Sequence, residues 1–341
     1  MAEPAHMLRV RRMILALLVL VALAAAGGYA WLAHHYRAPG PAQHTVRVQV
    51  RAGDTLRQVF SRMQALGALN APRAVELYLR LTGAQPRMEI GVYDIPARAS
   101  PADIVQMFEA GRVVLDKLTV VEGATFAQFL AALDADPDVV PSLRGKSDAQ
   151  IMAALGHPGE QPEGRFFPDT YRFSPGTSDL TILAMAYDQM SAELAKVWHE
   201  RRAGLPLKNS YQALILASLI EKETGVADER ARIAGVFVRR LRDHMLLQTD
   251  PSVIYGMGAR YDGNIRKSDL TTDTPYNTYT RPGLPPTPIA LPGKPAIEAA
   301  LHPAAGDSLY FVARGDGGHV FASSLAEHNR NVDCYQRKHC R

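Results

Sequence analysis

Residues 209–225 read NSYQALILASLIEKETG, and the larger part of the chain is expected to fold around them. Asn209 with Gln212 three residues later matches a capping box, and Gly225 suits a helix end, so about four turns of helix are expected between them. Seven of the eight residues 213–220 are apolar, and Ser218 is the exception. A helix that is apolar on every side is surrounded by protein, so this segment predicts the central helix of a domain.

Glu221 follows that apolar run directly. One turn earlier on its face lie Ala217 and Ser218, which are small groups, and the last turn of a helix disfavours an anion. Both effects favour the protonated carboxyl that a general acid needs near neutral pH. The alternative is an exposed Glu221 at a fraying helix end, paired with Lys222 or with an arginine from residues 229–240.

Glu223 lies two residues further on and points about 200° away around the helix. The two carboxylates therefore cannot face each other as a catalytic pair. The sequence leaves open whether Glu223 orients Glu221 or only caps the helix end.

The composition describes an ordinary globular protein. The 341 residues are 47% apolar, and 38 Lys and Arg stand against 34 Asp and Glu, for a net charge of +4. That length suffices for two globular units, and the apolar content excludes intrinsic disorder. Nucleic acid is not expected as a partner, because an excess of four charges over this length lacks the clustered basic face that phosphate backbones require.

The N-terminal segment predicts a membrane anchor. Residues 13–33, MILALLVLVALAAAGGYAWLA, contain no charge and reach about 31 Å as a helix, which is the hydrocarbon thickness of a bilayer. Arg9, Arg11 and Arg12 just before it favour a cytoplasmic N-terminus. The alternative is a cleaved signal peptide, since residues 22–24 (Ala-Leu-Ala) have the pattern that a signal peptidase accepts.

This interpretation divides the first part of the chain into a cytoplasmic tail (1–12), a transmembrane anchor (13–33) and a Pro- and Gly-containing linker (34–44). In a bacterium, everything beyond the anchor would lie in the periplasm, where ATP and nicotinamide cofactors are not expected. No cofactor is predicted. Cys334 and Cys340 fall in or at the edge of a predicted C-terminal tail (334–341), where an oxidising compartment would allow them to close a small loop or leave them free.

Residues 45–115 predict a small domain of order β-α-α-β-α. Residues 45–50 alternate with period two, Gly53 supplies a turn and Asp54 is the expected N-cap of the next helix. The opening, residues 45–56 (TVRVQVRAGDTL), resembles that of a LysM module, a small peptidoglycan-binding fold. The resemblance predicts a LysM-like βααβ domain.

Residues 116–333 predict a larger mixed α+β domain. Capping boxes are expected at 125–128 and 147–150, and residues 180–244 are mainly helical in pattern. Residues 272–295 contain seven prolines, and such long loops are usually functional or disordered. A terminal hairpin (309–313 and 319–322) and a helix capped by Ser324 follow. The predicted fold class is therefore α+β behind a single transmembrane helix.

Common catalytic motifs are missing from the sequence. Val140 stands where a P-loop ending at residues 145–147 would need its first glycine, and neither H-E-x-x-H nor G-x-S-x-G occurs. Metal and serine-nucleophile chemistry therefore have no local sequence support, and no metal is predicted.

Ordered sequence blocks resemble the YceG-like endolytic murein transglycosylases. The first is residues 216–224, LASLIEKET. Further blocks occur in the same order as in that family, and the similarity runs from the anchor to about Asn331. They are Glu163-Gly164 with 167–171 (FPDTY), 247–251 (LQTDP) with 253–256 (VIYG), 276–279 (YNTY), 283–286 (GLPP), 302–303 (HP), 310–313 (YFVA), and 317–319 (GGH) with Phe321.

The resemblance implies a membrane-anchored lyase that cuts the MurNAc-β-1,4-GlcNAc bond inside nascent peptidoglycan strands and ends their elongation. It implies an inner-membrane protein with a cytoplasmic N-terminus and a periplasmic catalytic domain, working near a peptidoglycan synthase complex. The family's essential acid falls on Glu221. The residues expected to hold the glycan are Gln248, Asp250, Tyr255, Tyr276, Asn277, Tyr279 and His319.

Such a lyase leaves a 1,6-anhydro ring and adds no water. Ordinary glycosidases need two carboxylates, but here the nucleophile is the sugar's own C6 hydroxyl, so one residue can act as acid and then as base. Two alternatives remain at this stage. One is a non-catalytic, membrane-anchored peptidoglycan-binding scaffold, and the other is a hydrolase.

Overall fold

The computed structural model describes residues 5–337 and divides the chain into two units, Met1–Asp116 and Lys117–Arg341. Helices and short strands are mixed in both units, behind one apolar N-terminal helix, so the predicted α+β class is confirmed. The strands of the described residues form two-stranded sheets that pair β1 with β2, β3 with β5, β4 with β6, and β7 with β8.

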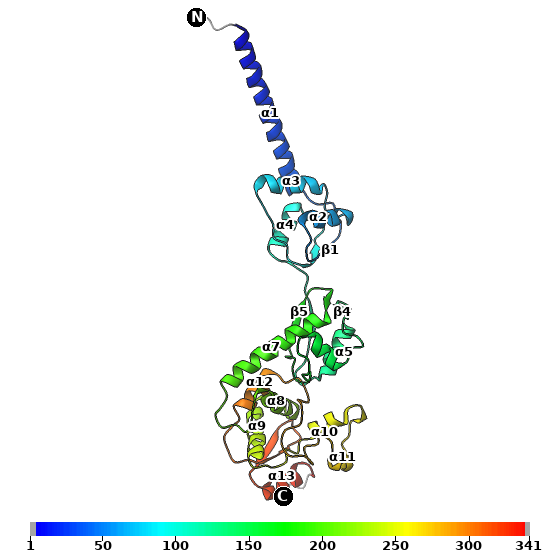
Figure 1. The fold of residues 1–341 in the computed structure, drawn as a ribbon, viewed down its shortest axis with the longest axis vertical. Helices are drawn as coiled ribbons and strands as arrows, with labels where there is room; N and C mark the ends of the chain where they lie inside the picture. The colour runs from blue at the N-terminus through cyan, green and yellow to red at the C-terminus, as the bar shows by residue number, and fades with distance from the viewer. Residues whose placement is uncertain (1–4, 338–341) are drawn as a thin grey trace. The chain divides into compact units, whose positions relative to one another are not determined.

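Unit 1 contains a long helix and a small α+β body (Figure 1). Its elements are α1 (Ala5–Arg37), β1 (Val46–Val50), α2 (Leu56–Ala65), α3 (Pro72–Thr82), β2 (Gly91–Ile95) and α4 (Pro101–Glu109). Strands β1 and β2 are antiparallel, with Val46 opposite Ile95. The rings of Phe60, Tyr93 and Phe108 are buried in the core. The predicted order β-α-α-β-α is confirmed, and the LysM-like identity stays a prediction.

The prediction that Asp54 caps α2 is wrong by one residue. The side chain of Thr55 accepts the hydrogen bond from the Gln58 backbone N–H and is the N-cap. Asp54 instead accepts from the Arg51 N–H at 2.8 Å and pairs with Arg62 at 2.8 Å. The carboxylate thus stabilises the turn before the helix.

Helix α1 is long and apolar enough between Arg9 and Arg37 to cross a membrane. It continues to Arg37, so the first four residues of the predicted linker (34–44) are helical. Tyr36 explains the extension, because its ring stacks on that of Tyr78 in α3 with 4.5 Å between centroids. Pro39 and Pro41 follow, and proline does not continue a helix.

Unit 2 holds the remaining elements. They are β3 (Asp116–Thr119, which begins at the unit boundary), α5 (Phe126–Ala135), β4 (Val139–Val140), α6 (Asp148–Ala154), β5 (Thr170–Phe173), β6 (Thr177–Ser178), α7 (Asp179–His199), α8 (Ser210–Glu223), α9 (Ala227–Arg242), α10 (Asp250–Met257), the 3₁₀ turn η1 (Gly258–Arg260), α11 (Lys267–Thr271), α12 (Lys294–Leu301), β7 (Tyr310–Ala313), β8 (His319–Ala322) and α13 (Leu325–Tyr335). The capping boxes predicted at Thr125 and Ser147 are confirmed.

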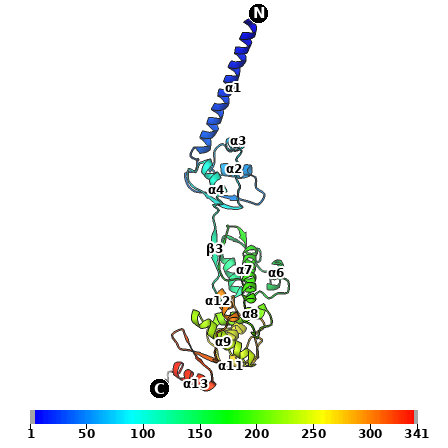
Figure 2. The same cartoon turned by 90° about the vertical axis from the view of Figure 1, so that its left-hand side faces the viewer.

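Helix α8 is the central helix of unit 2, as predicted. Residues 213–220 are at most 4% exposed, and α8 packs against α7, α9 and α12 (Figure 2) and also against α10. Asn209 caps it by accepting from the Gln212 N–H at 2.9 Å. The Gln212 side chain accepts from the Lys208 N–H at 2.7 Å, so the expected box is not closed on Asn209 itself.

Candidate functional site at the end of helix α8

The last turn of α8 carries two carboxyl groups that face opposite sides. Oε2 of Glu221 accepts a hydrogen bond from the Gly293 backbone N–H at 3.0 Å. Oε1 of Glu223 accepts from the hydroxyl of Thr249. Between them, Nζ of Lys222 donates to the Gly123 carbonyl at 3.2 Å. The helical spacing of two residues produces this divergence.

The Glu221 carboxyl is partly buried, and burial raises its pKa. The negative charge of Glu122 raises the pKa further. The Gly293 N–H and the charges of Arg230 and Lys222 lower it and limit the shift. The direction agrees with a carboxyl that holds its proton more readily than one in water.

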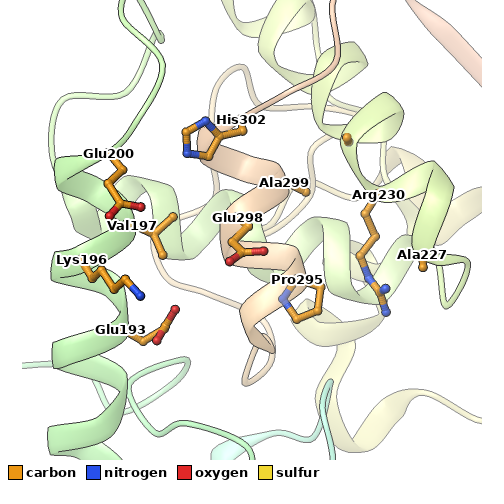
Figure 3. Close-up of a pocket in the computed structure, with 11 residues that line it drawn as sticks. Glu193, Lys196, Val197, Glu200, Ala227, Arg230, Pro295, Glu298, Ala299 and His302 are labelled. Atoms are coloured by element: carbon orange, nitrogen blue, oxygen red, sulfur yellow. The ribbon is translucent and has the colours of Figure 1, made fainter.

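Arg230 also lines a pocket of about 470 Å³ between α7, α9 and α12. Figure 3 shows the charged side chains of α7 facing those of α12, with Arg230 at the far side. Acidic and basic groups alternate in this pocket, and Lys294 Nζ lies 3.0 Å from Glu193 Oε1 at its edge. None of the residues predicted to hold the glycan is among the described residues that line it.

Glu223 is surrounded more closely than Glu221. Burial raises the pKa of its carboxyl to about 7, and the charge of Asp250 adds to the shift against the opposing hydrogen bond from Thr249. The residue remains partly accessible to solvent. A carboxyl that is tightly enclosed, protonated near neutral pH and still reachable has the properties of a general acid.

Two residues predicted to bind the glycan lie in this same cluster. The hydroxyl of Tyr279 donates to Oδ1 of Asp250 at 2.5 Å, and the charge of Glu223 also acts on Tyr279. Thr249 occupies the N-cap position of α10, and Asp250 is the first residue of the helix. Glu223, Thr249, Asp250 and Tyr279 are called the Glu223 cluster below.

A strained turn holds Thr249 against Glu223. The backbone of Gln248 is left-handed (φ 52°), which costs a residue with a side chain about 1–2 kcal/mol. Its N–H donates to the Thr278 carbonyl at 3.1 Å. The buried guanidinium of Arg240 donates to the Gln248 side chain at 3.2 Å and to the Leu247 carbonyl at 3.0 Å. Strain that is fixed in this way is typical of functional sites.

A second cavity of about 670 Å³ begins at Lys222 and extends along α10 and α5. Tyr255 and Tyr276 line it, with ring centroids 5.0 Å apart in an edge-on arrangement. The Tyr255 hydroxyl donates to Oε2 of Glu163 at 3.0 Å, and the Phe126 N–H donates to Oε1 at 3.0 Å. Burial raises the pKa of Glu163 to about 7. We call this space the Tyr255 cavity.

Asn277 lies apart from both solvent and cavity. It is 1% exposed, and its Nδ2 donates to the carbonyls of Asp269, Leu270 and Thr272 at 2.7–3.2 Å. Its Oδ1 accepts from the Tyr279 N–H at 2.9 Å. All of these bonds shape the loop that carries Tyr276 and Tyr279, so the side chain has a structural role and no group left to face a sugar.

His319 also lies outside the Glu223 cluster. Its ring Nδ1 is 2.7 Å from Oε2 of Glu229, and its backbone N–H donates to Oε1 of the same carboxylate at 2.8 Å. Burial of Glu229 opposes ionisation, but the hydrogen bonds and charge from His319 outweigh it and lower the Glu229 pKa. The pair attaches strand β8 to helix α9.

Several residues that the structure brings to the site have no role predicted from the sequence. Glu163 and Thr249 were present only as letters of matched blocks, and Arg240 was one of several arginines in a helix. The spacing of Glu223 from Glu221 predicts opposite faces, which is confirmed. No local pattern indicates which face of α8 the segment 247–251 covers.

The family to which these features belong is identified by comparison. The model of the YceG-like family matches residues 48–334. The chain belongs to the YceG-like family.

Relatives in this family are similar over most of the chain. An endolytic murein transglycosylase of Bacillus subtilis strain 168 is 32% identical over 312 residues, covering 85% of each protein. Another, from Streptococcus pneumoniae serotype 2 strain D39, is 27% identical over 371 residues, which cover 95% of this chain and 65% of that relative. The chain therefore spans about two thirds of the pneumococcal protein.

A solved family member has a similar structure. The crystal structure of a YceG-like protein from Listeria monocytogenes aligns with a TM-score of 0.53 and 27% sequence identity. The alignment covers 84% of this chain and 98% of the Listeria chain. The YceG-like fold therefore accounts for most of both units.

Proposed function

We propose that this YceG-like protein is an endolytic lytic transglycosylase, a lyase that cleaves peptidoglycan strands internally. The observation that carries the proposal is the 32% identity, over 85% of both proteins, to a relative named endolytic murein transglycosylase. The enclosed carboxyl of Glu223 at the end of α8 is chemically suited to that reaction, and Lys222 in the same turn lines the Tyr255 cavity.

The resemblance places the general acid and base on Glu221, which stays a prediction, and we propose Glu223 as the alternative that its neighbours support. Of the expected glycan-binding residues, Asp250 and Tyr279 lie beside Glu223. Glu221 accepts its hydrogen bond from Gly293 and lies within the electrostatic reach of Arg230. Two opposed faces cannot both meet one scissile bond, and the side of Glu223 carries residues of the matched blocks 247–251 and 276–279, namely Thr249, Asp250 and Tyr279.

The reaction needs a single carboxyl. Protonated Glu223 donates its proton to the glycosidic oxygen as the bond from C1 of MurNAc to that oxygen breaks. The C6 hydroxyl of the same MurNAc then forms a bond to C1, and its proton passes to the Glu223 carboxylate. Glu223 is regenerated, no water is consumed, and the products are a free 4-hydroxyl and a 1,6-anhydro ring.

Asp250 and Thr249 set the acidity of Glu223. The carboxylate of Asp250 makes ionisation of Glu223 unfavourable, and the Thr249 hydroxyl stabilises the carboxylate that forms after proton donation. The Tyr255 cavity provides aromatic surface and polar groups for neighbouring sugars. Gln248, which is exposed beside the turn, is suited to hydrogen-bond the glycan.

Helix α1 is compatible with a single-pass membrane anchor. Within the proposal, Arg9, Arg11 and Arg12 keep the N-terminus in the cytoplasm, and both folded units lie on the outer side of the cell membrane. That location supports work on nascent strands close to a peptidoglycan synthase complex.

The test compares E223Q and E221Q in the full-length protein, using purified peptidoglycan and mass spectrometry of the released products. Glutamine preserves the shape of the side chain but cannot donate a carboxyl proton. General acid catalysis contributes about 10²–10⁴-fold, so E223Q is expected to lose at least 100-fold of the anhydromuramyl release. E221Q is expected to keep most of it.

Each contrary outcome is informative. Equal loss in E221Q alone would return the catalytic role to Glu221. Products one water heavier than the anhydro form would identify a hydrolase. Retained binding to sacculi with no cleavage by the wild type would identify a scaffold.

A further inference from the structure

The end of α1 and helix α3 form a packed pair within unit 1. Tyr29, Leu32 and Tyr36 fall at spacings of three and four, so they share one face of α1. The Tyr78 ring of α3 lies 5.9 Å from that of Tyr29 and 4.5 Å from that of Tyr36, centroid to centroid. Leu32 is 7% exposed and Tyr78 is 8% exposed. Leu32 and Tyr78 are therefore closed to solvent at the centre of the contact, and Tyr29 lies at its exposed edge.

The position of this contact along α1 determines its depth in a membrane. The charge-free segment begins at Met13, and α1 is one unbroken helix from Ala5 to Arg37. With a rise of 1.5 Å per residue, Tyr29 stands about 24 Å and Tyr36 about 35 Å beyond Met13. The hydrocarbon core is about 30 Å thick. A helix that packs on residues 29–36 therefore lies where hydrocarbon gives way to headgroups.

The surface of α3 suits that depth. Leu77 and Leu81 lie one turn apart beside Tyr78, and both are exposed in the chain alone, at 48% and 60%. Arg73 and Arg80 are exposed on the same helix. Leucines with flanking arginines are typical of helices that rest in the interfacial layer, because the guanidinium groups reach the phosphates. Tyr29 and Trp31 of α1, about half exposed, are aromatic residues of the kind that gather there.

We propose that α3 lies in the interfacial layer of the membrane that α1 crosses, with Leu77 and Leu81 in contact with lipid. The inference rests on α1 as a membrane span and is independent of which carboxyl performs catalysis. The occupant of the leucine surface is the bilayer, because the packed face of α1 and α3 fixes the two leucines at the depth of the acyl-chain boundary. Unit 1 is then held to the membrane by two helices.

Spin labels on the full-length protein test the depth of α3. Single cysteines carrying a nitroxide replace Leu77 or Leu81, with Cys334 and Cys340 changed to serine, in nanodiscs of phosphatidylcholine and phosphatidylglycerol. Both leucines are exposed, so the label leaves the core packing intact. Collision rates with oxygen, which concentrates in lipid, and with a nickel chelate, which stays in water, are then compared. The oxygen-to-nickel ratio at both sites is expected to exceed that at position 90 several-fold.

Two labelled controls make the result decisive. Val19 lies inside the charge-free segment, about 9 Å beyond Met13 along the helix, and Ile90 is 65% exposed just before strand β2. V19C should give a lipid-like ratio and I90C a water-like ratio. Water-like ratios at 77 and 81 with a lipid-like ratio at 19 would overturn the proposal. A water-like ratio at 19 would remove its premise, the membrane span, and leave the catalytic proposal untouched.

Discussion

At the scale of single residues, neighbours set the chemistry of the two carboxyls more than their place in the helix does. Both follow the same apolar run and both lie in the last turn of α8. Glu221 meets a backbone N–H and two cations, which limit the rise of its pKa, whereas Glu223 meets a hydroxyl and the carboxylate of Asp250. The environment of Glu223 brings the pKa of its carboxyl to about 7.

D250N should shift the pH dependence of cleavage. The charge of Asp250 raises the Glu223 pKa, so its removal lowers that pKa and Glu223 loses its proton at a lower pH. The descending alkaline limb of kcat/KM, expected near pH 7 in the wild type, should move toward acid. Asparagine keeps an acceptor for the Tyr279 hydroxyl. The pH-rate profiles of the two proteins provide the measurement, and superimposable alkaline limbs would contradict the assignment.

At the scale of elements, α8 acts as the support of the site. It is buried over two turns, and its last turn presents Glu221, Lys222 and Glu223 to three different surroundings. Ser218, the polar exception in the apolar run, explains how the helix is fixed. Its hydroxyl donates to the Ile215 carbonyl at 2.7 Å and accepts from the Ile289 N–H at 3.0 Å. The serine thereby attaches α8 to the proline-rich segment.

S218A should destabilise the fold by about 1–3 kcal/mol, because it leaves the buried Ile289 N–H without a partner. Thermal unfolding of the detergent-solubilised protein measures the effect. S61A serves as the control, since Ser61 lies on the exposed side of α2 and such changes stay within about 0.5 kcal/mol. Equal melting temperatures of S218A and the wild type would show that the bond to Ile289 contributes nothing.

Local signals in the sequence predicted elements well and contacts between elements poorly. The caps at Thr125 and Ser147 and the central burial of α8 followed from spacing alone, because they depend on residues within one or two turns. The Thr249–Glu223 bond joins residues 26 positions apart. It depends on a left-handed turn at Gln248 that no local pattern indicates, and the same holds for Glu163 beside Tyr255, 92 positions away.

At the scale of the whole molecule, the carboxyl groups with raised pKa values make the free energy of unfolding depend on pH. Glu163 and Glu223 have pKa values near 7 in the folded protein against a reference of 4.5. Between these values the folded state binds more protons than the unfolded state, so the free energy of unfolding falls as pH rises from about 4.5 to about 7. The buried Glu163 alone contributes up to about 3 kcal/mol to that fall.

E163Q should flatten this dependence, because glutamine is neutral at every pH. Thermal unfolding from pH 4.5 to 8 is expected to show a smaller loss of stability in E163Q than in the wild type. E298Q is the matched control, since the Glu298 side chain is half exposed, and it should reproduce the wild-type slope. A wild-type slope in E163Q would mean that Glu163 is already ionised at pH 5.

The contact of Tyr78 with Tyr29 and Tyr36 limits how freely the N-terminal helix can be exchanged. Many single-pass proteins tolerate exchange of their transmembrane helix for an unrelated one, because any apolar helix of adequate length can span the bilayer. In this chain the segment, which is compatible with a membrane span, also packs on the folded body of unit 1, so an unrelated replacement would remove one side of that packing. Exchange of the N-terminal apolar helix for an unrelated one should therefore impair the folding of unit 1, even where the new helix enters the membrane.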